Sequence, residues 1–257
     1  MKSLLVFPAQ WYPTQPYLST PYLCSYLKEK SWDVTQRDFN IESYDHFLSP
    51  TVLEKIVSKI ESRLTELKSQ KSFSFKEKSL MDVMATGVKF APTIISGVND
   101  AKKVMRTPEL FFDFNTYKQA DMIIKSALKL VSDAYSPSIL TLSTFESGTR
   151  AEESTQRSTE FARNKNINPF IDLYDEVLLP SEPWENYSLV GISIVGISQI
   201  LPGLTLARLL KEKYSHLHIT LGGPIFSVNS KQLLGHPEFF QEFCDSIVTF
   251  EGEEPLH

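Results

Sequence analysis

Cysteine is scarce in this chain: the two that occur, Cys24 and Cys244, lie far apart in the sequence. Two distant cysteines exclude a metal site or an iron–sulfur cluster built from three or four thiolates, and they fit a reducing, cytoplasmic setting. Histidine is almost as sparse, and no ligand spacing is found among the five residues His46, His216, His218, His236 and His257. The sequence therefore predicts no metal ion held directly by protein side chains.

Long hydrophobic runs and long basic runs are also missing. No apolar stretch approaches the roughly 18 residues that a membrane-spanning helix needs. The short apolar run near the N-terminus breaks at Pro8 and has no small-residue cleavage site, unlike a signal peptide. The chain has 26 Lys and Arg against 31 Asp and Glu, without a clustered positive stretch. We therefore expect a soluble, cytoplasmic protein with neither nucleic acid nor a membrane as a partner.

What the chain does have is two kinds of hydrophobic pattern. Hydrophobic residues make up 42% of its 257 positions, enough for one large domain or two small ones. Short apolar stretches predict strands at 3–7, 32–39, 188–195, 217–221 and 245–256. Helical patterns alternate with them at 21–30, with Thr20 as N-cap, from Pro202 to about 215, and at 236–243; 222–230 reads as a loop. This alternation predicts an α/β fold with an open parallel sheet and flanking helices.

Between the two α/β segments the pattern becomes helical. Apolar residues recur four apart at Val52, Ile56, Ile60 and Leu64, with charged residues between them, which is typical of an amphipathic helix. Similar patterns predict helices at about 76–105, 117–134, 151–164 and 169–177, and residues 139–142 could form a strand. We expect residues 1–48 and 180–257 to form the sheet domain and 49–179 to form a large helical insertion or cap.

The loops that follow the predicted strands carry the candidate ligand-binding residues. Such loops meet at the carboxyl edge of an open parallel sheet, where ligands bind near the switch in strand order. A proline- and aromatic-rich loop follows Phe7, a Ser-x-Val strand end follows 192, a Gly-Gly-Pro turn follows 221, and an acidic turn follows 250. The candidates in these loops are Gln10, Trp11, Tyr12, Gln15, Ser193, Val195, Ser198, Gln199, Gly222, Gly223, Pro224, Glu251, Gly252 and Glu253.

Each of these loops also has a purely structural interpretation. A glycine pair can simply make a tight turn, and Ser193 can bond its own backbone neighbours. The acidic turn can be solvated, and the proline-rich loop can simply pack against its neighbours. A ligand interpretation gives the glycines a different reason: residues without a Cβ let a bulky group come close to the backbone.

Taken in order, these features resemble the N-terminal cobalamin-binding region of cobalamin-dependent radical SAM enzymes, especially peptide-maturation and natural-product methyltransferases. The segments that carry the likeness lie within 2–48 and 187–256 and read YLCSYLKE, DFNIE, LVGIS, LPGLTLARLLKE, HITLGGP and EGEEPL. The resemblance implies a Rossmann-like sheet with the corrin ring over its carboxyl edge. Ser193, Val195, Gly222 and Gly223 would flank the dimethylbenzimidazole tail, while the proline-rich loop and Glu251–Glu253 would border the ring and its amides.

The sequence departs from related families at two places. Cobalamin domains of mutases carry DxHxxG, whose His binds cobalt, whereas Asp45 and His46 are adjacent here and lack that spacing. We therefore expect the tail base off the cobalt and no protein His beneath it. Radical SAM enzymes hold a 4Fe–4S cluster through CxxxCxxC, which does not occur here, and the sequence ends where the barrel begins in the family. The cluster and S-adenosylmethionine would then belong to a C-terminal radical SAM domain of a longer parent enzyme.

Two other functions remain open from the sequence. The first is a stand-alone cobalamin-responsive sensor or carrier, in which the helical segment is an output surface. The second is an ordinary nucleotide- or sugar-binding enzyme. Neither GxGxxG nor GxxxxGKS/T occurs, and no nucleophile–base pair is evident, so the second has the least support.

Overall fold

The structure is a computed structural model and describes residues 2–70 and 72–256. It divides into two compact units, one made of Met1–Ser43 and Thr149–His257 and the other of Tyr44–Gly148. Residues 149–179, grouped with the helical segment in the sequence analysis, thus lie with the sheet. The reason is packing: the helix at 155–163 contacts the helix at 200–213, and Asn168 Nδ2 donates a hydrogen bond to Thr205 Oγ1 at 2.9 Å.

The first unit is built on a five-stranded parallel sheet, which confirms the predicted α/β fold with a Rossmann-like open sheet. Its strands lie in the order β2-β1-β5-β6-β7. Their bounds are β1 Lys2–Phe7, β2 Asp33–Asp38, β5 Leu189–Ser193, β6 His218–Gly222 and β7 Ser246–Val248. The order reverses between β1 and β5, so the connections that leave these two strands diverge, which is the arrangement that opens a ligand crevice.

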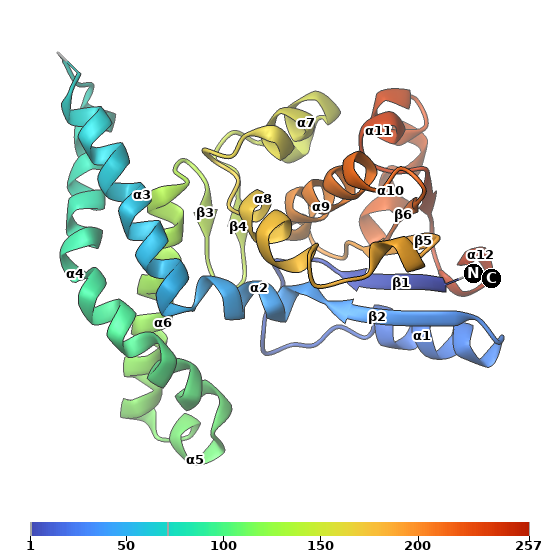
Figure 1. The fold of residues 1–257 in the computed structure, drawn as a ribbon, viewed down its shortest axis with the longest axis horizontal. Helices are drawn as coiled ribbons and strands as arrows, with labels where there is room; N and C mark the ends of the chain where they lie inside the picture. Colours follow the sequence, from blue (N-terminus) through green and yellow to red (C-terminus); the bar gives the residue numbers. More distant parts are fainter. Residues whose placement is uncertain (1, 71, 257) are drawn as a thin grey trace. The chain divides into compact units, whose positions relative to one another are not determined.

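Helices cover the two faces of this sheet. In Figure 1, α1 lies on one side of the sheet and α9 on the other, as right-handed crossovers in opposite directions require. The helices of this unit are α1 Ser19–Glu29, α7 Thr155–Arg163, α8 Phe170–Leu173, α9 Ile200–Lys213, α10 Pro224–Leu233, α11 Pro237–Glu242 and α12 Glu253–Leu256, with short turns at Ala151–Glu153, Tyr174–Leu178, Trp184–Asn186 and Ile197–Gln199. The helix α2, Phe39–Phe47, crosses the boundary between the units.

The second unit is helical, as predicted. Its helices are α3 Pro50–Lys68, α4 Phe75–Arg106, α5 Pro108–Phe111 and α6 Phe114–Ala134, and α3, α4 and α6 pack against one another. The apolar stripe of α3 is buried at Ile56, Ile60 and Leu64, while Val52 is only half-buried and Leu53 takes the core position. The strand at 139–142 also exists, in shortened form: β3 Ile139–Leu140 pairs antiparallel with β4 Phe145–Glu146.

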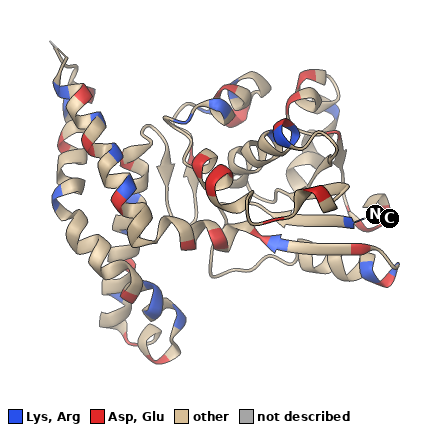
Figure 2. Cartoon of the chain, viewed as in Figure 1, with Lys and Arg blue, Asp and Glu red and all other residues tan. Residues whose placement is uncertain are grey.

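Charge is distributed evenly over the helical unit. Figure 2 shows Lys and Arg interspersed with Asp and Glu along α3 and α4. Several of these residues pair within the unit, for example Arg106 with Asp45 at 2.7 Å. Among the described residues, no helix combines the length and the apolar character that a membrane crossing demands.

Three local expectations were wrong, each for a physical reason. The helix α1 begins at Ser19 after Leu18, and Thr20 is a buried residue inside it rather than its N-cap. Residues 222–230 are not an exit loop, because α10 begins at Pro224, where the missing N–H of proline suits the first turn. The last strand is only Ser246–Val248, and the acidic turn after it leads into α12.

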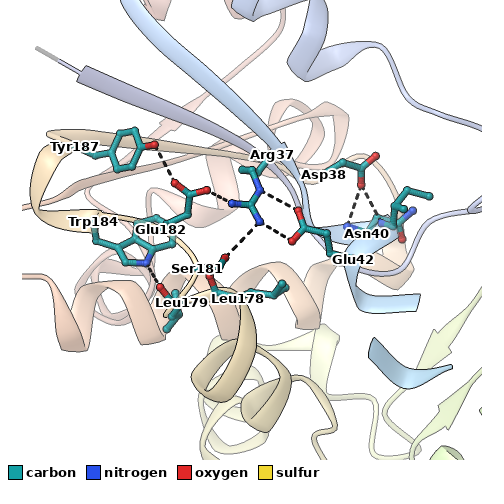
Figure 3. Close-up of polar contacts among 11 residues, drawn as sticks. Arg37, Asp38, Asn40, Glu42, Leu178, Leu179, Ser181, Glu182, Trp184 and Tyr187 are labelled. Atoms are coloured by element: carbon teal, nitrogen blue, oxygen red, sulfur yellow. Dashed lines mark hydrogen bonds and ion pairs between the residues drawn. The ribbon is translucent and has the colours of Figure 1, made fainter. Parts of the chain in front are cut away.

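A polar network fixes the end of β2 and the entry to α2 (Figure 3). The guanidinium of Arg37 forms a bidentate pair with Glu42, at 2.9 and 2.6 Å, and also pairs with Glu182. Glu182 in turn accepts a hydrogen bond from the Tyr187 hydroxyl at 3.0 Å. These contacts raise the pKa of Arg37, chiefly through the hydrogen bonds to Glu42. The network ties the segment before β5 to the edge strand β2.

The buried thiol of Cys244 gives a pH-dependent test of this fold. Burial raises its pKa to about 12 from 9.0, so the folded state favours the neutral thiol. The corresponding stability is present below pH 9 and is lost as the pH rises toward 12. Between pH 9.5 and 11 we expect the wild type to lose more unfolding free energy than Cys244→Ala, by up to about 1.4 kcal/mol per pH unit. Urea unfolding of both proteins measures this, and parallel pH profiles would contradict it.

Candidate functional site

A cavity of about 450 Å³ lies at the carboxyl edge of the sheet. Four strands, the first turns of α1 and α10, and the segment from β7 through α12 supply its walls. The lining residues are Leu5, Tyr17, Ser19, Thr20, Tyr22, Leu23, Gly191, Ile192, Ser193, Val195, Thr220, Gly222, Gly223, Pro224, Ser227, Val228, Val248, Phe250, Gly252, Glu253 and Leu256. This is the edge at which open parallel sheets bind their ligands.

The cavity exists because the two faces of β5 and β6 carry different side chains. On one face, Val190 and Ile192 of β5 and Ile219 and Leu221 of β6 are at most 1% exposed, as expected for a face covered by a helix. On the other face the same strands present Gly191, Ser193, Thr220 and Gly222, all of which line the cavity. This second face has too little apolar surface to be a good helix-packing surface.

The residues on this face form two rows across the strands. Leu5, Gly191 and Thr220 are register neighbours in β1, β5 and β6. One step further toward the carboxyl edge, Ser193, Gly222 and Val248 form the second row. Because side chains two apart on a strand point the same way, both rows face the same cavity.

Gly191 keeps the floor of the cavity open. A Cβ at this position would lie 2.9 Å from Leu5 Cδ2 and 3.6 Å from Thr220 Cγ2. Any side chain here would therefore push Leu5 aside and fill the space above the sheet. A glycine in the middle of a central strand is costly for the strand, and it commonly marks a place where another group comes close.

The glycine pair after β6 has two separate roles. Gly222 has room for a side chain, since its Cβ would come no closer than 3.8 Å to Val248, and that side chain would enter the cavity. Gly223 has φ +120°, and a Cβ there would lie 2.0 Å from the Ile194 carbonyl oxygen. The turn into α10 thus requires a glycine at position 223, as the structural interpretation proposes. Gly222 is not required by the backbone, and its missing side chain leaves space in the cavity.

One of the residues that line the cavity has a buried hydroxyl without a partner in the described part of the chain. Thr220 is 3% exposed, and its Oγ1 has no hydrogen-bond partner among the described residues. The other strand hydroxyl in the cavity is satisfied, because Ser193 Oγ lies 2.8 Å from Ser19 Oγ at the start of α1. A buried hydroxyl with no partner costs about 1–3 kcal/mol. Thr220 lines the cavity, while its Oγ1 atom is itself enclosed.

The mouth of the cavity is aromatic and almost uncharged. Tyr17, Tyr22 and Phe250 line it and remain 38%, 59% and 77% exposed. Phe250 has φ +62°, a rare conformation for a bulky residue, and its N–H donates to Ser227 Oγ at 2.7 Å. Glu253 is the single carboxylate among the lining residues. The cavity therefore suits a neutral group with flat apolar faces.

Half of the residues predicted for the site line this cavity: Ser193, Val195, Gly222, Gly223, Pro224, Gly252 and Glu253. Gln199 instead braces the backbone, because its Oε1 accepts from Val195 N at 3.0 Å and its Nε2 donates to Pro8 O at 2.9 Å. Glu251 is exposed and Ser198 is half-buried, and neither lines the cavity.

The proline-rich loop stands beside the cavity. Asn40 Oδ1 accepts the N–H groups of Gln10 and Trp11, at 3.0 and 2.8 Å. The Trp11 indole donates to Gln15 O at 2.9 Å. Tyr12 contacts Trp11 edge-on, with the ring centroids 5.9 Å apart. This loop is tied to α2 and forms a firm border beyond the cavity mouth.

Sequence reasoning missed Gly191 and Thr220 as site residues. Both lie inside strands rather than in the loops where candidates were sought. The signal was available, because small residues alternate with Val, Ile and Leu in LVGIS and HITLG, and a period of two identifies one face of a strand.

No metal-binding cluster of three or more His, Cys, Asp or Glu occurs within residues 2–70 and 72–256. Comparison with family models, with curated proteins and with solved structures finds no match to this chain. The interpretation of the cavity therefore rests on its residues.

Thr220→Val tests whether the hydroxyl is unsatisfied. The substitution keeps the shape and removes the unpaired group, so we expect the ligand-free protein to gain roughly 1 kcal/mol of unfolding free energy. Thr205→Val is the matched control, because that buried hydroxyl bonds both Leu201 O and Asn168 Nδ2 and its loss should destabilise the protein. Urea titrations measure both, and a loss of stability in Thr220→Val would contradict the assignment.

Proposed function

We propose that the sheet unit binds cobalamin, with the nucleotide tail inserted into the cavity and the corrin ring over the carboxyl edge of the sheet. The observation that carries this proposal is the face of β5 and β6 built from Gly191, Ser193, Thr220 and Gly222, which leaves the cavity open. A planar, neutral, bulky base needs such a slot, because any larger side chain at these positions would occupy its volume.

The residues around the slot fit the other parts of the cofactor. Tyr17, Tyr22 and Phe250 offer flat apolar faces at the mouth, and Glu253 offers a carboxylate that can accept hydrogen bonds from corrin amides. The loop from Gln10 to Gln15 and the turn at Glu251 would border the ring. No histidine is among the residues that line the cavity. We therefore propose that the base is off the cobalt and that no protein imidazole replaces it.

The parent activity follows from the family resemblance. We propose a cobalamin-dependent radical SAM methyltransferase, in which bound cobalamin supplies a cobalt-carried methyl group. This chain would bind and orient the cofactor and keep its base in the slot. The 4Fe–4S cluster and S-adenosylmethionine would be held by a C-terminal radical SAM domain. The free, buried thiols of Cys24 and Cys244 support a cytoplasmic setting for the protein.

A second candidate is a cobalamin-responsive sensor or carrier. The observation that favours it is the exposure of aromatic residues on the helical unit, where Phe75, Phe112 and Phe114 are 90%, 82% and 71% exposed. Exposed apolar groups of this size are typical of protein contact surfaces. A CxxxCxxC motif encoded downstream in the same reading frame would favour the methyltransferase over the sensor.

Absorbance titration with hydroxocobalamin tests cofactor binding. The wild type should change the cobalamin spectrum and retain the red cofactor through gel filtration at micromolar concentration. Gly222→Leu is compatible with the strand backbone and places a side chain in the cavity, so we expect it to weaken binding at least tenfold, or about 1.4 kcal/mol.

Ser96→Leu provides the control for that substitution. It adds a leucine at an exposed position of α4 in the other unit and should bind like the wild type. Failure of the wild type to bind any cobalamin would refute the proposed function. Equal binding by Gly222→Leu and the wild type would show that the cavity is not where the cofactor binds.

A further inference from the structure

We infer that two copies of this chain associate through the groove between α4 and α6, with their α4 helices antiparallel across a twofold axis near Thr86. The occupant of the groove is thus a second copy of the same chain. The residues that line the groove lie between 79 and 133, within the helical unit. The association is therefore independent of the proposed cobalamin binding, which concerns the sheet unit.

The groove between α4 and α6 is apolar and open, with a volume of about 520 Å³. Val83, Phe90 and Met122 line it and are 38%, 55% and 57% exposed. Gly87 keeps it deep, because a Cβ at this position would lie 3.1 Å from Leu130 Cδ2 of α6. Large apolar side chains gathered around one exposed concavity are typical of a surface that another protein covers.

Charges of both signs occur toward the ends of α4, but the middle of the helix is nearly free of them. Residues 83–99 contain one charged residue, Lys89, over roughly five turns. Inside the groove, Lys129 and Asp133 pair with each other at 2.8 Å and together bring no net charge. Depletion of charge at the centre of an exposed apolar surface is the compositional mark of a protein–protein interface.

Two opposite charges at this surface identify the partner. Asp82 lines the groove, and Lys89 lies at its edge, with Nζ 5.8 Å from the centroid of the Phe90 ring. Neither side chain has an ion pair within the part of the chain that the structure describes. Residues 82 and 89 are two helical turns apart, so Asp82 and Lys89 lie on the same side of α4.

A twofold axis near Thr86 brings these opposite charges together. Asp82 precedes Thr86 by about as many residues as Lys89 follows it, so in an antiparallel pair the two charges differ in height by only about 1.5 Å. The symmetry makes this contact twice, and it also places Val83 of each copy opposite Phe90 of the other. A parallel pair would instead place Asp82 beside Asp82. The surface is thus complementary to itself, as a twofold dimer requires.

Sedimentation equilibrium of the full chain over a range of concentrations tests this arrangement. We expect the wild type to approach twice its monomer mass of 29.3 kDa. Asp82→Lys and Lys89→Asp each place like charges together at both contacts, so each variant should dimerise at least roughly tenfold more weakly. Mixed in equal amounts, the two variants should recover the dimer, because every introduced charge then meets an opposite charge on the other chain.

The apolar part of the contact has its own variant. Phe90→Ser should weaken the dimer at least roughly tenfold. Phe112→Ser is the matched control, because Phe112 is 82% exposed but does not line the groove, and it should dimerise like the wild type. Glu61→Lys, at an exposed position of α3, is the control for charge reversal. It should remain dimeric, and mixing it with Lys89→Asp should not strengthen association. Circular dichroism verifies that each variant is folded.

Two results would overturn the proposed dimer. The first is a wild type that sediments as a monomer at every concentration, as it would if the groove served a helix of another protein or a lipid surface. The second is a dimer that the single charge reversals leave unchanged, or one that the mixture of Asp82→Lys with Lys89→Asp does not restore. Such a dimer would form through a different surface of the chain.

Discussion

The structure depends on a difference between the two faces of its central strands. A parallel sheet normally buries both faces under helices and therefore carries Val, Ile and Leu on both. Here β5 and β6 follow that rule toward α9, where Val190, Ile192, Ile219 and Leu221 are buried. Toward α1 they carry Gly191, Ser193, Thr220 and Gly222 instead. Because the strands are held by the first face, the second can remain open without loss of the fold.

The borders of the open face are fixed by contacts that do not involve a ligand. Gln199 connects the exits of β1 and β5 through Pro8 O and Val195 N. Gly223 passes against the Ile194 carbonyl, and Asn40 holds the start of the proline-rich loop through two backbone N–H groups. These buried contacts order the loops in advance. A ligand that enters the cavity would therefore meet a prepared site and would not pay to order its walls.

The topology was predictable because it is encoded in features that repeat. Apolar strands alternating with amphipathic helices indicate parallel pairing, and that pairing brings the strand exits to one edge whatever the loop sequences are. The glycine turn after Leu221 and the serine after Ile192 were found for this reason. The helical unit followed from the regular spacing of apolar residues in α3, where the core nevertheless uses Leu53 in place of Val52. A helical stripe is broad enough that either position fits the pattern.

The less predictable features depend on contacts between residues distant in the sequence. Nothing local shows that Gln199 reaches Pro8, 191 residues away, and the residue therefore resembles a ligand contact in the sequence. The same holds for Gly223, whose need for a missing Cβ comes from Ile194 rather than from a ligand. The start of α10 was obscured because Gly-Gly-Pro is as typical of a turn as of a helix N-terminus.

Three departures from good packing lie at the cavity, and departures of two of these kinds also occur elsewhere in the described chain. Gly191 weakens a central strand, Thr220 buries a hydroxyl without a partner, and Phe250 adopts a positive φ. Each costs stability, and each lies on the wall or mouth of the same cavity. Natural sequences are otherwise consistent between local preference and fold, and they depart from this consistency mainly at functional sites. Buried atoms without a hydrogen-bond partner among the described residues are also found at Ser3 and Tyr174, and positive φ also at Gln10, Ser31 and Arg150. The feature that sets the cavity apart is therefore the alternation of small residues along one face of β5 and β6.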